Sequence, residues 1–237
     1  MSVAQDQSAA QPTTPPATDS PASYAPTDRT IPTRAKERAA YDRELVHSIL
    51  DETYICHLGF VRDDAPVVLP TLYGRVGERL YVHGSSGSRP LRMAGQRDPG
   101  LPVCLTVTHV DGLVLARSAF HHSINYRSVV VHGTAHQVTD AEEKRLALDA
   151  IVDHVVDGRA ADSRAANAKE LAATAVLRLD LSEVSAKVRA GGPNDEPEDM
   201  ELPHWAGVVP VQRGYGELIP SDDLAEGIDV PSYLKGL

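Results

Sequence analysis

The chain has 237 residues, a formal net charge of −10 and a pI of about 5.4. This acidic balance argues against a nucleic-acid partner, which needs a basic surface to neutralise phosphates. Hydrophobic residues make up 42% of the chain, enough for a sizeable core, yet no stretch has the apolar length that spans a bilayer. The N-terminus lacks the basic start and apolar middle of a signal peptide. We therefore predict a cytoplasmic protein with no nucleic-acid and no membrane partner.

The beginning of the chain differs in composition from the rest. Residues 1–33 are rich in Ala, Gln, Ser, Thr and Pro, which offer little surface to bury, so they predict a disordered tail. Order is expected from Arg34. Residues 34–50 predict a helix, because Tyr41, Leu45 and Ile49 recur at helical spacing.

A series of strands follows this helix. Strands are predicted over residues 53–62, 65–75 and 79–83, and a short helix over residues 90–96. Two more strands, 101–109 and 113–120, flank Asp111-Gly112, a dipeptide typical of hairpin turns, and a long strand covers residues 124–138. Cys56 and Cys104 lie in these apolar runs without CxxC spacing, so both are predicted to be buried thiols.

The second half of the chain begins with a helix. Thr139 and Glu142 have the spacing of a capping box at its start. A short helix around Lys169 and a strand over residues 173–181 come next, and the end from Gly191 is rich in Pro and acidic residues. Six or seven strands joined by tight turns predict a mainly β protein, an antiparallel barrel with peripheral helices. No GxGxxG follows a strand, so a Rossmann nucleotide site is not supported.

The segment most indicative of chemistry runs from His83 to Arg89. A strand ends there, and Gly84 and Gly87 are followed by hydroxyls, a guanidinium and the start of a helix. Backbone N–H groups, hydroxyls and an arginine at a helix N-terminus are the donors of an anion site, and they point to Ser85, Ser88 and Arg89 as phosphate ligands. A polar turn with a surface arginine is the competing interpretation.

A second polar stretch, residues 123–128, opens the long strand. Alternation puts Asn125 and Arg127 on one face and Tyr126 and Ser128 on the other. Arg127 at a barrel mouth could meet a phosphate or an electron-rich ring, and an exposed strand start is the alternative.

The chain contains ten histidines, each of which is a potential metal ligand. His121 and His122 resemble a ligand pair but have no accompanying cluster with zinc spacing. His132 and His136 share a strand face, but four strand residues separate them by roughly 13 Å, too far for one ion. No metal site is predicted. His83 adjoins the phosphate turn, where packing and substrate contact are both open.

Taken in order, several segments resemble one known family. They are residues 41–43, 55–60, 69–73, 80–85, 111–118, 125–129, 185–189 and 205–210. The set is similar to the pyridoxamine 5′-phosphate oxidase-like flavin-nucleotide-binding proteins, and within them to the branch of the nitroimidazole-resistance reductases. The resemblance covers residues 34–211, which would form the flavin-binding domain, and it leaves residues 212–237 as a C-terminal extension.

The resemblance implies an antiparallel six-stranded split β-barrel that forms a homodimer with FMN at the interface. It places the flavin phosphate at Ser85, Ser88 and Arg89 and His83 near the flavin. The other positions it assigns to the cofactor site are Pro70, Thr71, Leu72, Tyr73, Tyr126, Arg127, Ser128, Lys187 and Trp205. The substrate-binding arginine pattern of true pyridoxamine phosphate oxidases does not follow Trp205. Oxidation of vitamin B6 is therefore not expected.

The leading hypothesis is an FMN-dependent oxidoreductase. It would pass electrons from a nicotinamide or similar donor to a small, flat acceptor such as a nitro compound or a quinone, with His83 as proton donor or substrate clamp. A cofactor that carries its own redox chemistry explains why no catalytic triad is visible. The alternatives are a flavin-storing or sensing protein without turnover, and a split barrel that binds FAD, F420 or haem instead, with His83, His121 or His122 as the haem ligand.

Overall fold

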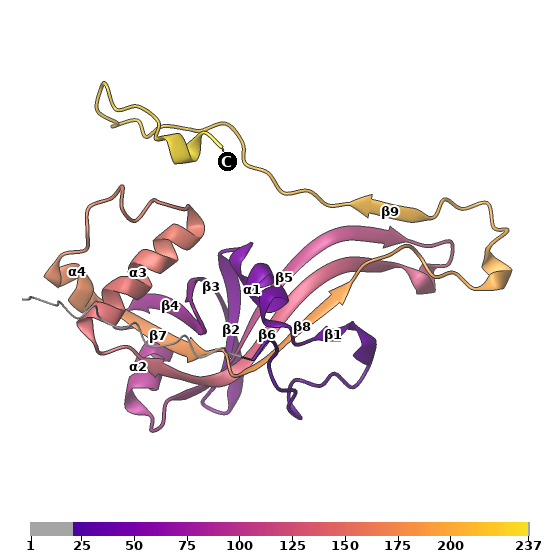
Figure 1. Cartoon of the computed structure of the whole chain (residues 1–237), viewed down its shortest axis with the longest axis horizontal. Coiled ribbons are helices and arrows are strands. Elements are labelled where there is room, and N and C mark those ends of the chain that lie inside the picture. Colours follow the sequence, from indigo (N-terminus) through magenta and orange to yellow (C-terminus); the bar gives the residue numbers. More distant parts are fainter. Residues whose placement is uncertain (1–20, 237) are drawn as a thin grey trace, which may run out of the picture.

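The computed structural model describes residues 21–236 of the chain, and Figure 1 shows it as a curved antiparallel sheet with helices at its margins. The strands are β1 (Ala39–Ala40), β2 (Ile55–Arg62), β3 (Ala65–Val76), β4 (Arg79–Ser85), β5 (Leu101–Leu115), β6 (Ser123–Gln137), β7 (Thr174–Asp180), β8 (Glu183–Arg189) and β9 (Gly207–Pro210). Six of them close into a ring in the order β2, β3, β4, β7, β6, β5, back to β2. The predicted barrel is confirmed, with β1, β8 and β9 added outside the ring.

Four helices border the barrel: α1 (Arg43–Asp51), α2 (Arg89–Gln96), α3 (Ala141–Val155) and α4 (Ala168–Ala173). Short 3₁₀ helices lie at Lys36–Arg38, Ala119–His121, Pro197–Asp199 and Ser232–Leu234. Asp42 begins α1 by accepting a hydrogen bond from the Leu45 amide, as an N-cap does. The cap of α3 is Asp140, one residue after the predicted Thr139, because Asp140 accepts from the Glu143 amide.

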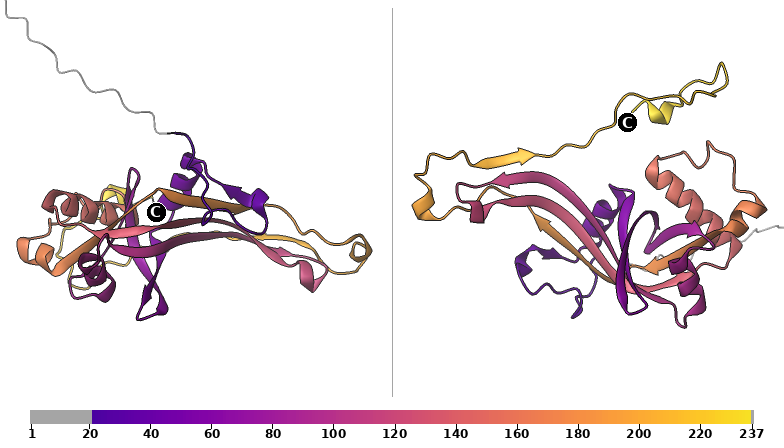
Figure 2. Two further views of the ribbon diagram at one scale, coloured as in Figure 1. Left: turned by 90° about the horizontal axis from the view of Figure 1, so that it is seen from below. Right: turned by 180° about the vertical axis from the view of Figure 1, so that it is seen from behind.

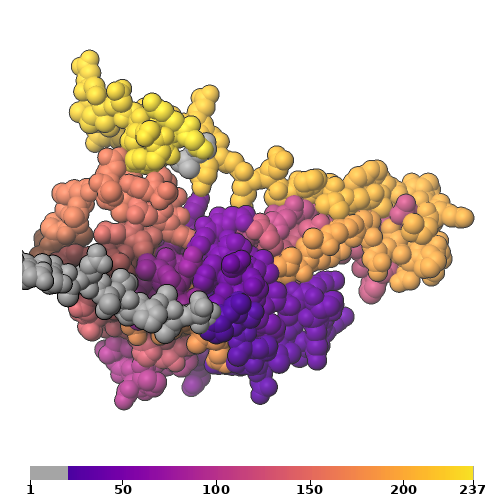
Figure 3. Space-filling view, in the orientation of Figure 1, coloured from indigo at the N-terminus to yellow at the C-terminus, as the bar shows by residue number. Residues whose placement is uncertain are grey.

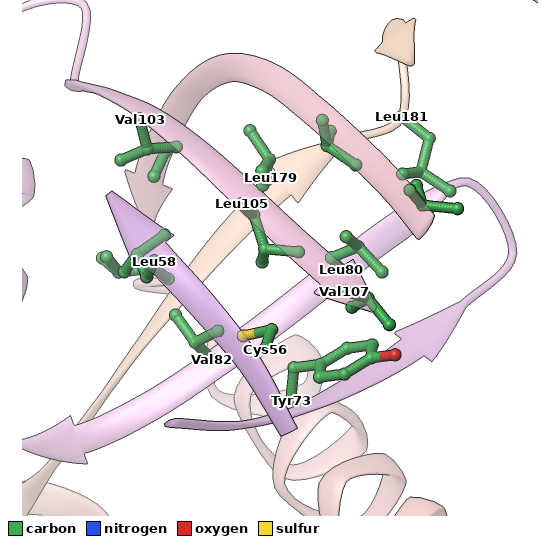
Figure 4. Packing of buried hydrophobic residues seen from close by; sticks show 14 of the residues in the cluster. Cys56, Leu58, Tyr73, Leu80, Val82, Val103, Leu105, Val107, Leu179 and Leu181 are labelled. Carbon is green, nitrogen blue, oxygen red and sulfur yellow. The ribbon is translucent and has the colours of Figure 1, made fainter. Parts of the chain in front are cut away.

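The main core fills the barrel. Its fully or almost fully buried side chains include Leu58, Tyr73, Leu80, Leu105 and Leu177, and Figure 4 shows several of them, from β2, β3, β4 and β5, packed together. Alternation along β2, with every second residue buried, directs Cys56 and Leu58 inward and Ile55 and His57 outward.

The two cysteines differ in how deeply they are buried. Cys56 is buried, and burial raises the pKa of its thiol to about 12, which keeps it protonated and unreactive. Cys104 is only half-buried, so the prediction of two buried thiols is right for Cys56 alone.

The predicted hairpin turn at Asp111-Gly112 is wrong. Strand β5 continues through this dipeptide to Leu115, and the register with β6 shifts between Val110 and Gly112, which marks a β-bulge. The chain turns back only after Leu115, so β5 and β6 form one long hairpin that projects from the barrel (Figure 1). Asp-Gly favours turns when the flanking strands end there, but here both neighbours of the dipeptide keep their ladder hydrogen bonds.

Order also begins earlier than predicted. Tyr24 is buried in the main core, and Ser23 forms a bridge with Asp42, so the described part of the predicted tail packs on the barrel. Residues 1–20 of that tail lie outside the described residues. The predicted helix over residues 34–50 is shorter than expected, because a 3₁₀ turn and β1 precede α1.

The chain beyond β8 forms an arm, defined here as residues 190–236. It is fastened at the hairpin end by the Asp195 carboxylate, which accepts from Arg117 at 3.0 Å, and by β9, which pairs with β5. From β9 it runs back over the barrel, as the two views of Figure 2 show. Its far end reaches the loop after α3, where the Tyr233 hydroxyl donates to Asp162 at 2.6 Å. Figure 3 shows this end of the arm, in yellow, lying over that part of the molecule. No helix in the described residues is long and apolar enough to cross a membrane.

Candidate functional site

A cavity of about 170 Å³ lies where β4 passes into α2, and we call it the first cavity. Its walls are mostly apolar, with a few polar groups, a composition typical of cofactor sites. The lining residues are Leu58, Leu69, Pro70, Thr71, Val82, His83, Ser88, Pro90, Leu91 and Leu177. Four of the predicted site residues, Pro70, Thr71, His83 and Ser88, are therefore brought together from β3, β4 and the start of α2.

His83 is the polar side chain with the most unusual environment in the first cavity. Its Nδ1 atom is buried and has no hydrogen-bond partner in the described part of the chain. Burial lowers the pKa of the imidazole, which therefore stays neutral at physiological pH. A buried nitrogen without a partner costs free energy, so His83 is a polar group whose hydrogen-bonding capacity is unused within residues 21–236.

The turn from Ser85 to Arg89 offers fewer donors than its sequence suggests. The amide of Ser86 donates to Ala173 O at 2.8 Å, and those of Gly87 and Ser88 donate to Ser85 at 3.2 and 2.8 Å. The Ser88 hydroxyl caps no amide of α2, and the exposed Arg89 has no ion pair among residues 21–236. These two side chains, together with the exposed hydroxyls of Ser85 and Ser86, are donors still available for an anion.

Leu72 and Tyr73, the other two predicted residues of β3, do not line the first cavity. Leu72 is half-buried against a second, smaller hydrophobic cluster beneath α3. Tyr73 is fully buried, and its hydroxyl donates to Leu50 O at the end of α1. The side chain of Tyr73 belongs to the core, so only its backbone is available to a cofactor.

The remaining predicted residues do not line the first cavity. Arg127 forms ion pairs with Glu52 and with Asp111, the latter at 2.8 Å. Ser128 lies opposite Lys187 in the β6–β8 ladder, and Lys187 Nζ lies 3.5 Å from Arg34 O. Tyr126 is the register partner of Arg189, and Trp205, 65% exposed, lies on the arm.

A second cavity of about 990 Å³ lies between the outer face of β2 and the arm. It is lined by Glu52, Thr53, Tyr54, Ile55, His57, Thr108, Gln212, Arg213, Gly214 and Tyr215. No motif in the sequence predicts this site. The alternation of β2 places His57 outward, but nothing in the sequence indicated that residues 212–215 return to cover it.

Two histidines that were considered as haem ligands lie at the hairpin end. His121 lies 3.6 Å from Glu196, and the His122 ring donates to Ser118 O at 3.1 Å. The fully buried His109 donates to Ile49 O at 2.9 Å. Among the described residues, no group of three or more His, Cys, Asp or Glu side chains could hold a metal ion.

The family model described as pyridoxamine 5′-phosphate oxidase matches residues 42–188, more than half of the chain. The protein therefore belongs to the pyridoxamine 5′-phosphate oxidase-like family. A comparison with curated protein sequences found no match.

Two solved structures are similar over most of the chain. The flavocytochrome Anf3 from Azotobacter vinelandii is 38% identical, with a TM-score of 0.83, covering 90% of this chain and 98% of its own. An FAD and haem binding protein from Mycobacterium smegmatis is 39% identical, with a TM-score of 0.79, covering 84% of this chain and 96% of its own. A putative 5-nitroimidazole antibiotic resistance protein from Bacteroides thetaiotaomicron shares the fold, with 23% identity, a TM-score of 0.51 and 63% of this chain covered.

The coverage by Anf3 shows that its likeness to this chain extends beyond the region matched by the family model. The family model ends at residue 188 of 237, which leaves 49 residues after it. Anf3 leaves a tenth of the chain uncovered, about 24 residues, so at least about half of those 49 residues are aligned with it. The flavocytochrome and this chain therefore share much of the arm as well as the barrel.

Proposed function

We propose that this protein is a redox protein that binds a flavin and a haem. The observation that carries the proposal is the identity of 38% and 39% with a flavocytochrome and with an FAD and haem binding protein, over 90% and 84% of the chain. The nitroimidazole-resistance resemblance covers less of the chain, at lower identity. It supports the fold alone.

The residues of the first cavity fit a flavin. The hydroxyl of Ser88 lines the cavity, and the exposed guanidinium of Arg89 follows it at the start of α2, so the two suit a phosphate at the rim; His83 adds a polar group to the wall. Pro70 and Thr71 of β3 complete the wall. The sequence predicts FMN, whereas the description of the Mycobacterium relative favours FAD. Both cofactors carry a phosphate on the ribityl chain, so the same turn serves either.

The size of the first cavity supports a homodimer. Ligand sites usually measure about 300–1,000 Å³, and this one measures about 170 Å³, too small to enclose a flavin. A second copy of the chain that packs over the opening would complete the site. This agrees with the prediction that the flavin lies at a subunit interface.

When bound, a flavin supplies one- and two-electron chemistry and a haem supplies one-electron chemistry at its iron. The protein's part is to bind, orient and exclude water. We propose an oxidoreductase that takes electrons from a nicotinamide or a similar donor and gives them to a small, flat acceptor of the nitro or quinone type. The neutral His83 would position the acceptor or hold a proton at its unpaired nitrogen.

The test is the absorption spectrum of the purified protein, followed by acid release of the bound molecules and their masses. We expect flavin bands together with a Soret band, and Arg89→Ala should weaken flavin binding at least tenfold by removing the guanidinium that meets the phosphate. Arg92→Ala, on the next turn of α2, is the matched control. A colourless protein that takes up neither flavin nor haem would refute the proposal, and a flavoprotein that oxidises no nicotinamide would leave a storage or sensing role.

A further inference from the structure

We propose that the second cavity is the haem site and that His57 is an axial ligand of the iron. This inference rests on the proposed function, since it assigns a place to the second cofactor. Haem iron takes four ligands from its macrocycle, so one or two protein side chains complete it. That is why a haem site is compatible with the absence, among residues 21–236, of any cluster that could hold a bare metal ion.

The donor set of the second cavity fits a haem. His57 is exposed on the outer face of β2, lines the cavity and makes no hydrogen bond within the described chain. Ile55 lies on the same strand face, and Tyr54 and Tyr215 add aromatic wall. The volume of about 990 Å³ is at the upper end of the range of roughly 300–1,000 Å³ for cofactor sites.

The charged side chains around the second cavity suit the two propionate groups of a haem. The carboxylate of Glu52 is paired with Arg127, which also pairs with Asp111. Arg213 has no carboxylate within ion-pair distance in the described residues; the pKa of Asp111 is lowered mainly by its hydrogen bond with Arg127, and Arg213 adds a smaller electrostatic effect. Arg213 is thus a cation at the rim that a propionate can engage, with the Gln212 amide beside it.

The other histidines are less suited to this role. His121 and His122 are engaged with Glu196 and Ser118 at the hairpin end, and His109 is fully buried with its Nε2 bonded to Ile49 O. His83 lines the first cavity, which is a small fraction of the size of the second. Of the histidines that line the two cavities, His57 is the one in the large cavity.

The position of His57 also suits electron transfer. It is the register partner of Pro70, a residue of the first cavity. Directly opposed residues of an antiparallel pair have Cα atoms about 4.5–5.5 Å apart, so the two cavities adjoin across β2 and β3. A flavin in the first and a haem in the second would lie side by side.

The closing strip of the second cavity comes from the arm, part of which is covered by the alignment with Anf3. Gln212, Arg213 and Tyr215 follow the region matched by the family model, and the arm reaches them because the Val211 amide donates to Asp111 O at 3.0 Å. The nitroimidazole-resistance relative covers only 63% of this chain, whereas the two haem-binding relatives cover 84% and 90%. The two relatives described as a flavocytochrome and as an FAD and haem binding protein thus cover more of this chain than the nitroimidazole-resistance relative does.

The experiment compares His57→Ala with the wild-type protein, both supplied with haem and flavin during expression. We expect His57→Ala to lose at least 90% of the haem, measured by the Soret band and by pyridine haemochromogen, while it keeps its flavin bands and its circular dichroism. Added imidazole should restore a Soret band. Arg213→Ala should release haem to apomyoglobin at least several-fold faster than the wild type.

The controls separate this inference from the proposed function. His122→Ala and His83→Ala should keep their haem, since neither side chain lines the second cavity. If the wild type holds haem and His57→Ala retains it with an unchanged spectrum, the assignment of His57 is wrong while the proposed function stands. If the wild type takes up flavin but no haem, the haem part of the proposed function fails, and this inference fails with it.

Discussion

Arg127 joins three elements beside the second cavity. Its guanidinium pairs with Glu52 at the end of α1 and with Asp111 in the bulge of β5, while Arg127 itself belongs to β6. Sequence alternation identified Arg127 as a polar group at a strand start, and the resemblance assigned it to the flavin. Neither showed its partners, because Glu52 and Asp111 lie 75 and 16 positions away in sequence.

Replacing Arg127 by Met should destabilise the protein at neutral pH and much less in acid. The hydrogen bonds of Arg127 hold the pKa values of Glu52 and Asp111 below their ordinary range. The pairs therefore stabilise the fold fully above the unfolded-state pKa values of about 4 and lose this effect as pH falls through the lowered folded values. We expect a loss of about 1 kcal/mol at pH 7, since the groups are partly screened by solvent.

The measurement for Arg127→Met is urea unfolding at pH 7, 5 and 3. Arg164→Met is the matched control, because the pair of Arg164 with Glu170 is exposed to solvent and should contribute little to stability at any of these pH values. Parallel stability curves of wild type and Arg127→Met across this pH range would contradict the prediction.

At the scale of elements, the bulge at Asp111-Gly112 decides where the arm goes. A Cβ at Gly112 would lie 3.0 Å from Val208 Cγ1 and 3.3 Å from Val209 O, so the absence of a side chain lets β9 pair with β5. The next link is the hydrogen bond from the Val211 amide to Asp111 O. Both contacts depend on the strand continuing through a dipeptide that local rules assign to a turn.

Gly112→Val should therefore release β9 and the arm without unfolding the barrel. The valine side chain would clash with β9, and β9 pairs with β5 alone, so this pairing should be lost. The ladder between β5 and β6 continues well beyond Gly112 and should hold. Limited proteolysis should cut the arm at least tenfold faster in this variant, with the barrel fragment resistant. Gly216→Ala, where an added Cβ meets no atom within 4 Å, is the control. Equal cleavage rates in Gly112→Val and the wild type would refute the role of the bulge.

Element patterns predicted the barrel better than they predicted its additions. Strands β2, β3, β4 and β7 lie within one or two residues of their predicted bounds, because turn residues end each apolar run. The pairing of β6 with β5, β7 and β8 was beyond local signals, as was β9, a four-residue strand within a Pro-rich segment. For the same reason the sequence indicated the phosphate turn of the first cavity, which is local, and missed the second cavity, which joins β2 to residues 212–215.

At the scale of the whole molecule, the projecting hairpin and the arm leave apolar side chains in solvent. Phe120 at the hairpin end is 86% exposed and Ile219 on the arm is 92% exposed, and further apolar residues of the arm lie open near them in sequence. Large apolar side chains exposed to this degree are candidates for burial against a partner. A second copy of the chain is the partner we propose, because it would also complete the small first cavity.

The intact protein should therefore be a homodimer of about 51 kDa, twice the 25.5 kDa of one chain, by light scattering after size exclusion. Phe120→Ser combined with Ile219→Ser should raise the dimer dissociation constant at least tenfold, because both apolar side chains lose their burial against the partner. Leu146→Ser on α3, where the leucine is 49% exposed away from the hairpin, is the control and should leave the dimer unchanged. The flavin should dissociate faster from the double variant in step with the loss of dimer, because the second copy completes the first cavity. A wild-type protein that elutes at 25.5 kDa with its flavin bound would show that one chain suffices for the site.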